Sequence, residues 1–156
     1  MVSSAKNYQR SNRITTVKLS FGEQAISHAR NLLILKDLGV RQTLGQSLLD
    51  ELCDAAQIDI CNVKVSDTQQ YHRRAGGRVV FKQYGYYRPR SRYIYIQNRT
   101  AVRGQVLAAK TFLDTLLHEW LHHYDTLKLG LNSIHTSGFY QRLKDLKTKL
   151  CGTKTS

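Results

Sequence analysis

The sequence predicts a single α+β domain in which two helices precede three short strands and two further helices follow them. Three observations lead to this prediction. Apolar residues recur at helical spacing near both ends of the chain, and strand-type alternation is confined to its middle. The chain of 156 residues is long enough for one ordinary domain, and it contains no internal repeat, linker or low-complexity stretch that would divide it.

Residues 1–13 are expected to form a flexible basic arm, and residues 14–156 to form the folded domain. The arm, MVSSAKNYQRSNR, is polar and basic and has no apolar periodicity. It lacks the apolar segment of a secretory signal, so we expect the protein to act in the cytoplasm, or in the nucleus of a eukaryotic cell, and not to be secreted. No apolar run approaches the length of a membrane span, so no membrane partner is expected.

Two helices are expected after the arm. Ser20 and Glu23 have the spacing of a capping box, and apolar residues then recur at helical spacing as far as Leu38. The second helix is expected to begin at Thr43 and to present an apolar stripe as far as Ala55. Both helices would bury these apolar faces against the rest of the domain.

Three strands are expected in the middle of the chain. Residues 58–65 alternate apolar and polar side chains with an irregularity near Cys61, residues 78–87 are rich in β-branched and aromatic side chains, and residues 92–98 alternate cleanly. The short link between the last two contains Pro89 and predicts a turn, so these strands are expected to pair as an antiparallel hairpin. The expected sheet is therefore small, three-stranded and at least partly antiparallel.

Two more helices are expected toward the C-terminus. The helical period returns at about Val106 and continues to Gly130, which is a natural stop for a helix. After a short loop, Phe139 and three leucines recur at helical spacing. This pattern predicts a final amphipathic helix with Thr136 or Ser137 as its N-cap.

The charge of the chain is strongly positive and unevenly distributed. Its formal net charge is +13, and no acidic residue occurs between Asp67 and Asp114. A segment of one sign attracts polyanions, of which nucleic acid is the commonest in a cell, although a solvated surface is the alternative interpretation. The arginines expected to contact nucleic acid are Arg73, Arg74, Arg78, Arg88, Arg90 and Arg92.

Aromatic residues within this basic segment indicate which nucleic acid would bind. Tyr71, Tyr84, Tyr86 and Tyr87 are interleaved with the arginines. Unpaired bases stack on exposed aromatic rings, whereas contacts of arginine with phosphate do not distinguish one base from another. We therefore expect DNA to bind with little sequence preference, and single strands to be favoured.

The three cysteines suggest no site of their own. Cys53, Cys61 and Cys151 are odd in number and widely spaced, and they match neither a zinc knuckle nor a disulfide framework. Free cysteines of this kind suit a reducing compartment such as the cytoplasm. No function is therefore predicted for them.

The most informative stretch is His118-Glu119-Trp120-Leu121-His122, on the helix that ends near Gly130. Side chains four residues apart share a helix face, so the two histidines point toward one place, and the glutamate lies one step round the helix. Neutral imidazoles bind Zn²⁺, the ion lowers the pKa of a bound water toward about 7, and a neighbouring carboxylate can take the proton. A chance match is the alternative, but two unpartnered imidazoles would be costly on so apolar a helix.

Zinc in such a site needs a third protein ligand, and the sequence offers two candidates. Asp125 lies three residues beyond His122 on the same helix face, and His135 follows the expected turn. His135 is favoured, because a returning loop can bring it to the metal from the side. Asp125 is expected to accept a hydrogen bond from a liganding imidazole or to cap the loop. His123 is rotated by about 100° from His122 and is expected to miss the metal, at the surface or behind the ligands.

The segment LLHEWLHHYD…SIHTSGFYQRL resembles the SprT-like zinc metalloprotease family, which includes the Spartan proteases of DNA–protein crosslink repair. The resemblance is sharp over residues 113–143 and extends to the order of the preceding elements. It implies a zincin-like fold whose zinc ligands are His118, His122 and His135. Glu119 would then activate the water that attacks a peptide carbonyl.

The leading hypothesis is therefore a zinc metallopeptidase that hydrolyses protein substrates, DNA-associated proteins among them. Many members of the family carry a cysteine zinc ribbon after the catalytic domain, and the resemblance here is to a catalytic domain without it. The alternatives are a basic nucleic-acid-binding module with a structural or inactive zinc site, and a zinc hydrolase of non-peptide substrates; an intact Glu119 favours the enzyme. The substrate is expected to pair as an extra strand with residues 92–98 at the edge of the sheet.

Overall fold

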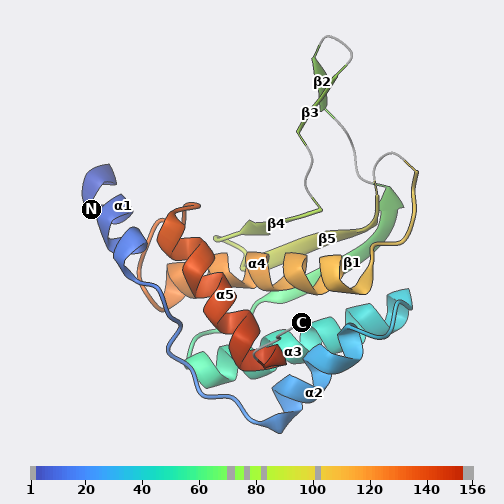
Figure 1. Ribbon diagram of the computed structural model, residues 1–156, viewed down its shortest axis with the longest axis horizontal. Helices are drawn as coiled ribbons and strands as arrows, with labels where there is room; N and C mark the ends of the chain where they lie inside the picture. Colours follow the sequence, from blue (N-terminus) through green and yellow to red (C-terminus); the bar gives the residue numbers. More distant parts are fainter. Residues whose placement is uncertain (1–2, 70–72, 76–77, 82–83, 101–102, 153–156) are drawn as a thin grey trace.

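The chain folds as an α+β domain, which confirms the predicted fold class (Figure 1). This computed structural model describes residues 3–69, 73–75, 78–81, 84–100 and 103–152. The helices within these ranges are α1 (Ser4–Arg13), α2 (Glu23–Leu32), α3 (Leu38–Ala56), α4 (Ala109–Leu127) and α5 (Ser137–Cys151). The strands are β1 (Asn62–Gln69), β2 (Arg73–Ala75), β3 (Arg78–Phe81), β4 (Gly85–Arg88) and β5 (Tyr93–Arg99).

The central sheet is mixed and has the strand order β1–β5–β4. β5 runs parallel to β1 and antiparallel to β4, so that Tyr95 lies opposite Lys64 on one side and opposite Tyr86 on the other. The predicted antiparallel hairpin is confirmed for β4 and β5, but its first strand, expected over residues 78–87, is divided in two. β3 pairs instead with β2, in a separate antiparallel hairpin that stands away from the sheet (Figure 1).

The two outer edges of the sheet differ. Side-chain amides from α3 occupy the outer edge of β1: Gln42 bonds to the main chain of Val63 and Val65, and Gln46 bonds to that of Cys61 and Val63, all at 2.8 or 2.9 Å. β4 forms the other edge, and β5 lies in the centre. The expectation that β5 is the open edge is therefore wrong, because β1 pairs with its second side.

The N-terminal helices differ from the prediction in their boundaries. α3 begins at Leu38 and not at the predicted Thr43, because Asp37 caps it: its carboxylate accepts a hydrogen bond from the N–H of Val40 at 3.0 Å. The capping box expected from Ser20 is not formed, since the N-cap of α2 is a glycine. α2 ends at Leu32 and not near the predicted Leu38; apolar residues continue through the link between the two helices, so their spacing alone does not reveal the break.

The first helix, α1, occupies most of the segment expected to be a flexible arm, so that expectation is wrong for residues 4–13. Its buried face contacts the C-terminal part of the chain. Asn7 exchanges hydrogen bonds with the main chain of Asn132 at 2.8 and 2.9 Å, and the hydroxyl of Ser11 lies 2.9 Å from that of Thr136. These partners are 125 positions away in the sequence, so no local pattern predicts the helix.

The hydrophobic core surrounds α4, which runs along the sheet and contacts α2, α3 and α5 (Figure 1). Phe112, Leu116 and Trp120 of α4 are fully buried, as are Ile94 and Ile96 of β5. Burial of a large apolar side chain contributes about 1.5–3 kcal/mol, so these contacts hold α4 firmly in place. The core thereby fixes the directions in which the polar side chains of α4 point.

A buried ion pair links α4 to α5. The guanidinium of Arg142 donates to the two carboxylate oxygens of Asp125 at 3.1 and 2.8 Å, and both side chains are fully buried. It also donates to the main-chain oxygens of Ser11 and Ile14, at 2.6 Å each, and to the hydroxyl of Ser11 at 3.3 Å. Removing one member of a buried pair leaves an unpaired charge and costs about 3–5 kcal/mol.

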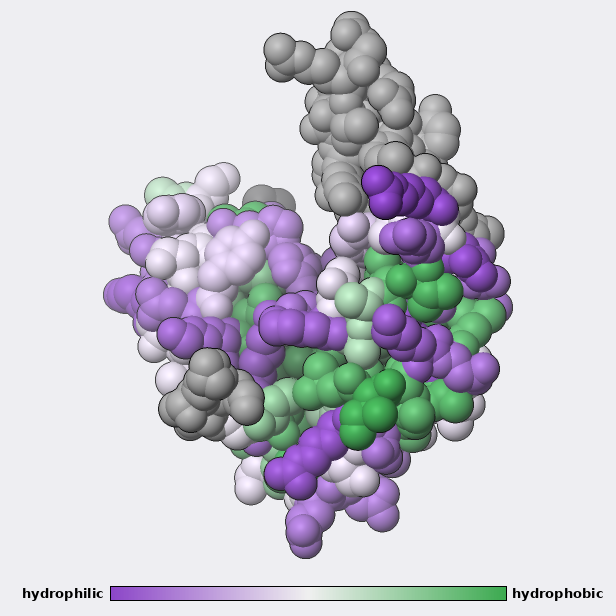
Figure 2. Space-filling model, turned by 45° about the vertical axis from the view of Figure 1, so that its right-hand side comes forward, coloured by the Kyte–Doolittle hydropathy of each residue, from purple (hydrophilic) through white to green (hydrophobic). Residues whose placement is uncertain are grey.

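The face shown in Figure 2 carries a hydrophobic patch flanked by hydrophilic residues. Exposed apolar residues include a run directly after α2, Leu33 to Leu35, in which Ile34 is 73% exposed. Within the described part of the chain, no helix has both the length and the apolar character that a membrane span requires.

We predict that Gly138→Ala destabilises the fold by disrupting the contact between α1 and α5. A Cβ at this position would overlap the carbonyl oxygen of Ser11 and lie 2.7 Å from that of Asn12. Both are main-chain atoms, so the helices must separate, and overpacking of this kind costs about 1–3 kcal/mol. Urea-induced unfolding should therefore occur at lower urea concentration than in the unaltered chain.

Gly45→Ala, inside α3, is the matched control for this prediction. Its Cβ would lie in ordinary contact with the side chains of Leu116 and Phe112, at 3.7 and 3.8 Å, and alanine is a better helix former than glycine. This variant should be as stable as the unaltered chain, or more stable. Equal stability of the two variants would contradict the proposed contact between the helices.

Candidate metal centre

Three histidines from two parts of the chain converge on one point. His118 and His122 project from one face of α4, and His135 comes from the loop before α5. The Nε2 atom of His135 lies 3.0 Å from the Nε2 of His118 and 3.0 Å from that of His122. Ligand atoms of all three lie within 4.8 Å of one another, so this histidine group could hold a metal ion.

The local sequence explains how His135 reaches α4. After the helix ends, Gly130 adopts a φ of +64°, a left-handed conformation that glycine allows at little cost. The N–H of Leu131 then donates to the carbonyl oxygen of Asp125 at 3.0 Å, which turns the chain back along the helix. Thr136 caps α5, so His135 is held between two fixed points.

The geometry and protonation of the histidine group suit Zn²⁺. Nitrogen ligands around a tetrahedral zinc ion lie roughly 3.3 Å apart, close to the separations in this group. The pKa of His118 is lowered to about 4, mainly by burial and to a lesser extent by His135 and Lys147. Burial likewise lowers the pKa of His122 to about 3, with added effects of His118, His135 and Arg142. Neutral imidazoles are the form that binds a metal, so the donor set fits zinc.

A chain of hydrogen bonds orients His122 through its second nitrogen. Its Nδ1 lies 2.8 Å from the hydroxyl oxygen of Ser133, and that hydroxyl donates to Asp125 at 2.8 Å. Because the hydroxyl hydrogen is directed to the carboxylate, Nδ1–H of His122 is the donor to Ser133, and Nε2 keeps its lone pair for a metal. Asp125 is paired with Arg142 and stands apart from the histidine group; it supports the imidazole through Ser133.

Phe139 packs against all three imidazoles. Its ring centroid lies 4.7 Å from that of His122, 5.1 Å from that of His118 and 5.2 Å from that of His135. The side chain is fully buried, so it forms a fixed apolar wall beside the rings. Such a wall limits the rotation of the imidazoles and keeps their Nε2 atoms directed at one another.

Glu119 lies beside the histidine group and faces a cleft. Its side chain is 8% exposed and lines this cleft together with His118 and His122. Burial raises the pKa of its carboxyl group to about 7, and no described residue forms an ion pair or hydrogen bond with that carboxyl group. A desolvated carboxylate without a partner is suited to accept and return a proton.

The cleft connects the histidine group with the edge of the sheet. It has a volume of about 720 Å³. Tyr86 and Tyr87 of β4 line one wall, α4 lines another, and Ser133 and Lys147 contribute from the returning loop and α5. The edge strand of the sheet and the histidine group therefore share one cleft.

The arginines expected to contact nucleic acid are partly described. Arg88, Arg90 and Arg92 are exposed at the turn between β4 and β5. Arg92 pairs with Asp59 at 2.9 Å, so one of these charges is compensated within the protein. The other predicted contacts fall outside the described residues and side chains: Arg73, Arg74, Arg78 and Tyr71.

Two of the tyrosines in the basic segment are engaged within the protein. The ring of Tyr86 stacks on that of Tyr95 at a centroid distance of 5.2 Å, and the guanidinium of Arg88 lies 5.0 Å from its centre. The hydroxyl of Tyr87 lies 2.7 Å from Nδ1 of His123. Base stacking on these two rings would therefore compete with existing contacts.

A second group of potential metal ligands consists of Cys53, Cys61 and His123, whose ligand atoms lie within 4.8 Å of one another. Sequence analysis assigned no site to the cysteines, because their spacing matches no motif and only the fold brings them together. His123 does stand apart from the histidine group, as expected, but it is fully buried and not at the surface. In the sequence, only its position directly after His122 draws attention to His123 as a potential metal ligand.

Comparison with protein-family models, with curated proteins and with solved structures gave no match to this chain. The site is therefore interpreted from its own residues. It combines two neutral imidazoles on one helix, a third on the returning loop, and a desolvated carboxylate beside them. Such an arrangement can bind a divalent metal ion and hold a base next to it.

We predict that His135→Ala weakens zinc binding far more than Ser133→Ala does. His135 contributes a ligand atom, whereas Ser133 only orients His122. Loss of an orienting partner typically costs about 10–100-fold in metal affinity, and loss of a ligand should exceed that. Competition with a chromogenic chelator measures both affinities.

Ser133→Ala is the suitable comparison, because removing Asp125 would leave the charge of Arg142 buried and unpaired. Unfolding curves of both variants should show that the fold is retained. If Ser133→Ala proves the more damaging change to zinc affinity, His135 is not a ligand.

Proposed function

We propose that this protein is a zinc-dependent metallopeptidase that hydrolyses peptide bonds in protein substrates, of the SprT-like type that its sequence resembles. The observation that carries the proposal is the convergence of His118, His122 and His135 beside Glu119 in a cleft. Structural zinc sites are normally closed by four protein ligands and need no base. Here three ligands face a cleft, and the carboxylate beside them has no partner among the described residues.

The zinc ligands would be His118, His122 and His135. When bound, the ion supplies Lewis acidity that polarises a water molecule and a substrate carbonyl group. Ser133 holds the proton of His122 on Nδ1 and so keeps Nε2 available as a ligand. Phe139 limits the rotation of the three rings, so little reorganisation is needed when the metal binds.

Glu119 would act as the general base. It takes a proton from the water that attacks the peptide carbonyl, and it later donates this proton to the amine that leaves. Glu119 lines the cleft but is only 8% exposed as a residue, so bulk water has little access to the proton it carries. A structural or inactive zinc site, which is the alternative, would not need this carboxylate.

The substrate would lie in an extended conformation along β4. This strand is the edge of the sheet that lines the cleft, whereas Gln42 and Gln46 occupy the outer edge of β1. Main-chain pairing with an edge strand holds an extended peptide whatever its side chains are. Unfolded or extended segments of proteins are therefore the expected substrates.

We also propose that the peptidase acts close to DNA, which makes DNA-associated proteins the expected substrate class. Arg88 and Arg90 are exposed on either side of Pro89, which lines the cleft. Unlike Arg92, neither forms an ion pair with a described residue. Exposed arginines that form no such ion pair can contact DNA phosphates without distinguishing the bases. DNA bound to Arg88 and Arg90 would therefore lie beside the cleft.

We predict that Glu119→Gln abolishes hydrolysis while zinc stays bound. Glutamine has nearly the same shape but cannot accept the proton of the attacking water, so the rate should fall by about 10²–10⁴-fold. Cleavage of an unfolded protein substrate, followed by gel electrophoresis, measures the activity. Metal analysis of the same samples measures the zinc content.

Glu23→Gln is the matched control. Glu23 is exposed on α2, and its substitution changes the charge of the chain by the same amount. It should retain both activity and zinc. An unfolded substrate cleaved at the full rate by Glu119→Gln would rule out the proposed mechanism. The same assay separates the peptidase from a module that only binds nucleic acid.

We predict that Arg88→Gln combined with Arg90→Gln weakens the binding of single-stranded DNA. Each lost phosphate contact should reduce the slope of log affinity against log salt concentration by about 0.7. Zinc content should not change, because neither arginine belongs to the histidine group. Lys36→Gln with Lys144→Gln removes the same charge at other exposed positions and serves as the control. If both double variants give the same salt dependence, the turn is not a DNA contact.

A further inference from the structure

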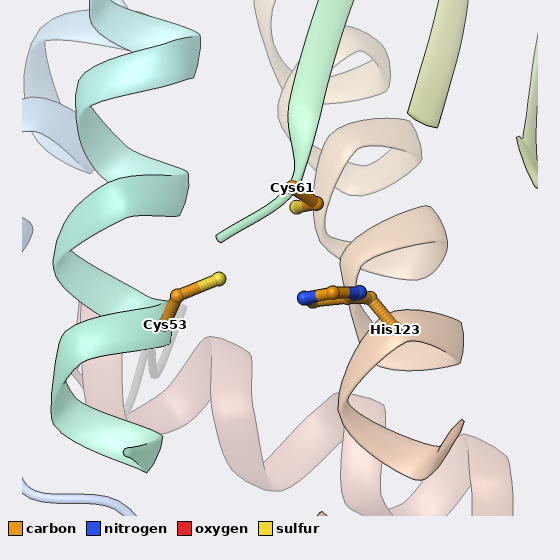
Figure 3. A group of neighbouring side chains, drawn as sticks. All are labelled: Cys53, Cys61 and His123. Atoms are coloured by element: carbon orange, nitrogen blue, oxygen red, sulfur yellow. The ribbon is translucent and has the colours of Figure 1, made fainter. Parts of the chain in front are cut away.

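A second cluster of metal-binding residue types lies in the core, on a different face of α4 from the cleft. Cys53 belongs to α3, Cys61 to the segment just before β1, and His123 to α4. Figure 3 shows their side chains directed toward one another across the space between the two helices. Their ligand atoms lie within 4.8 Å of one another, and all three residues have 0% exposure.

We propose that Cys53, Cys61 and His123 form a second zinc site, separate from the histidine group and structural in role. Two thiolates and an imidazole belong to the ligand types that hold structural Zn²⁺. Sulfur and nitrogen ligands around a tetrahedral zinc ion lie roughly 3.3–3.8 Å apart. Ligand atoms that already lie within 4.8 Å need to move together only slightly.

The hydrogen bonds of His123 are compatible with metal binding through Nε2. Its Nδ1 lies 2.7 Å from the hydroxyl oxygen of Tyr87. Metal-binding histidines usually donate the proton of their second nitrogen to an oxygen atom, and the hydroxyl of Tyr87 can accept it. His123 therefore has the outer partner that a liganding imidazole requires.

The fourth donor is the main-chain carbonyl oxygen of Asp59. It lies 2.7 Å from Nε2 of His123, and it belongs to the same segment as Cys61. Without an ion, Nε2–H donates to this oxygen. An ion bound at Nε2 would replace that hydrogen and would have the Asp59 oxygen beside it.

The surroundings of Cys53 suit a sulfur atom that carries negative charge. The indole N–H of Trp120 donates to its Sγ atom at 3.3 Å. A neutral thiol is a weak acceptor, whereas hydrogen bonds to a charged acceptor are stronger. Two adjacent cysteines alone would be ordinary core residues; the imidazole and the indole donor make this cluster a site.

A zinc ion at this position would cross-link the elements that pack behind the cleft. It would join α3, the segment before β1, and α4 at one point. His123 directly follows His122 of the histidine group, and Tyr87, which contacts His123, lines the cleft on β4. The ion would therefore hold His123, and with it the contact to Tyr87 of β4, in a fixed position.

Cobalt substitution tests this proposal on the unaltered chain. The protein is purified with its thiols reduced, stripped of metal and loaded with Co²⁺ alone. Thiolate ligands give a cobalt ion an intense charge-transfer band in the near ultraviolet, which a site made only of histidines cannot produce. We expect this band, together with two cobalt ions per chain.

Variants assign the band to its residues and separate this site from the proposed peptidase site. Cys53→Ser and Cys61→Ser should each lose the band and one cobalt ion, whereas Cys151→Ser, which changes the partly exposed third cysteine, should keep both. His135→Ala should lose the other ion and keep the band. If a core variant does not fold, titration of the unaltered chain with a mercurial reagent, which displaces thiolate-bound metal, identifies the same ion.

Two results would overturn the proposal. One is the absence of the band in the unaltered chain when all three thiols titrate as free after unfolding. The other is a disulfide between Cys53 and Cys61 in the cobalt-treated chain, detected by mass spectrometry after free thiols have been blocked. Either result would leave the assignment of the histidine group unaffected.

Discussion

The buried ion pair of Arg142 and Asp125 is the contact on which the geometry of the histidine group depends. Two charges in a core are tolerated only when every donor and acceptor is satisfied. The guanidinium reaches the carboxylate and the backbone of α1, and the carboxylate also accepts from Ser133. Since Ser133 contacts Nδ1 of His122, the order of this network sets the orientation of an imidazole that we propose as a metal ligand. The site is therefore complete only when α1, α4, α5 and the returning loop are docked.

The features that the sequence predicts correctly are those with local physical causes. Helical period and the spacing of His118 and His122 place two imidazoles on one face of α4, and Thr136 caps the next helix through its own side chain. Pro89 marks the turn of the β4–β5 hairpin. The preference for His135 over Asp125 as a ligand stays a prediction, which follows from coordination chemistry and the reach of a returning loop. The fold brings His135 to the group and holds Asp125 against Arg142.

The features that the sequence does not predict depend on contacts between distant residues. α1 is held by Asn7 and Ser11, polar residues that carry no apolar period, and their partners lie near the other end of the chain. The position of β5 at the centre of the sheet depends on parallel pairing with β1, which no turn signal announces. The cluster of Cys53 and Cys61 with His123 exists only because α3 packs beside α4. In each case the information lies in tertiary packing and not in spacing.

Helix phase explains how α4 can serve two groups of ligands. Successive residues are rotated by about 100°, so His122 and His123 point in different directions from one turn of helix. The first faces a cleft, where a metal could keep an open position for substrate; the second faces a core with no exposure, where sulfur ligands would enclose an ion fully. The cleft at His122 suits a catalytic metal ion that exchanges water for substrate. The core at His123 suits a structural metal ion that cross-links the elements around it. In the arrangement that we propose, α4 can contribute to both groups of ligands because its core contacts fix its rotation about the helix axis. A small change in that rotation would disturb both groups at once.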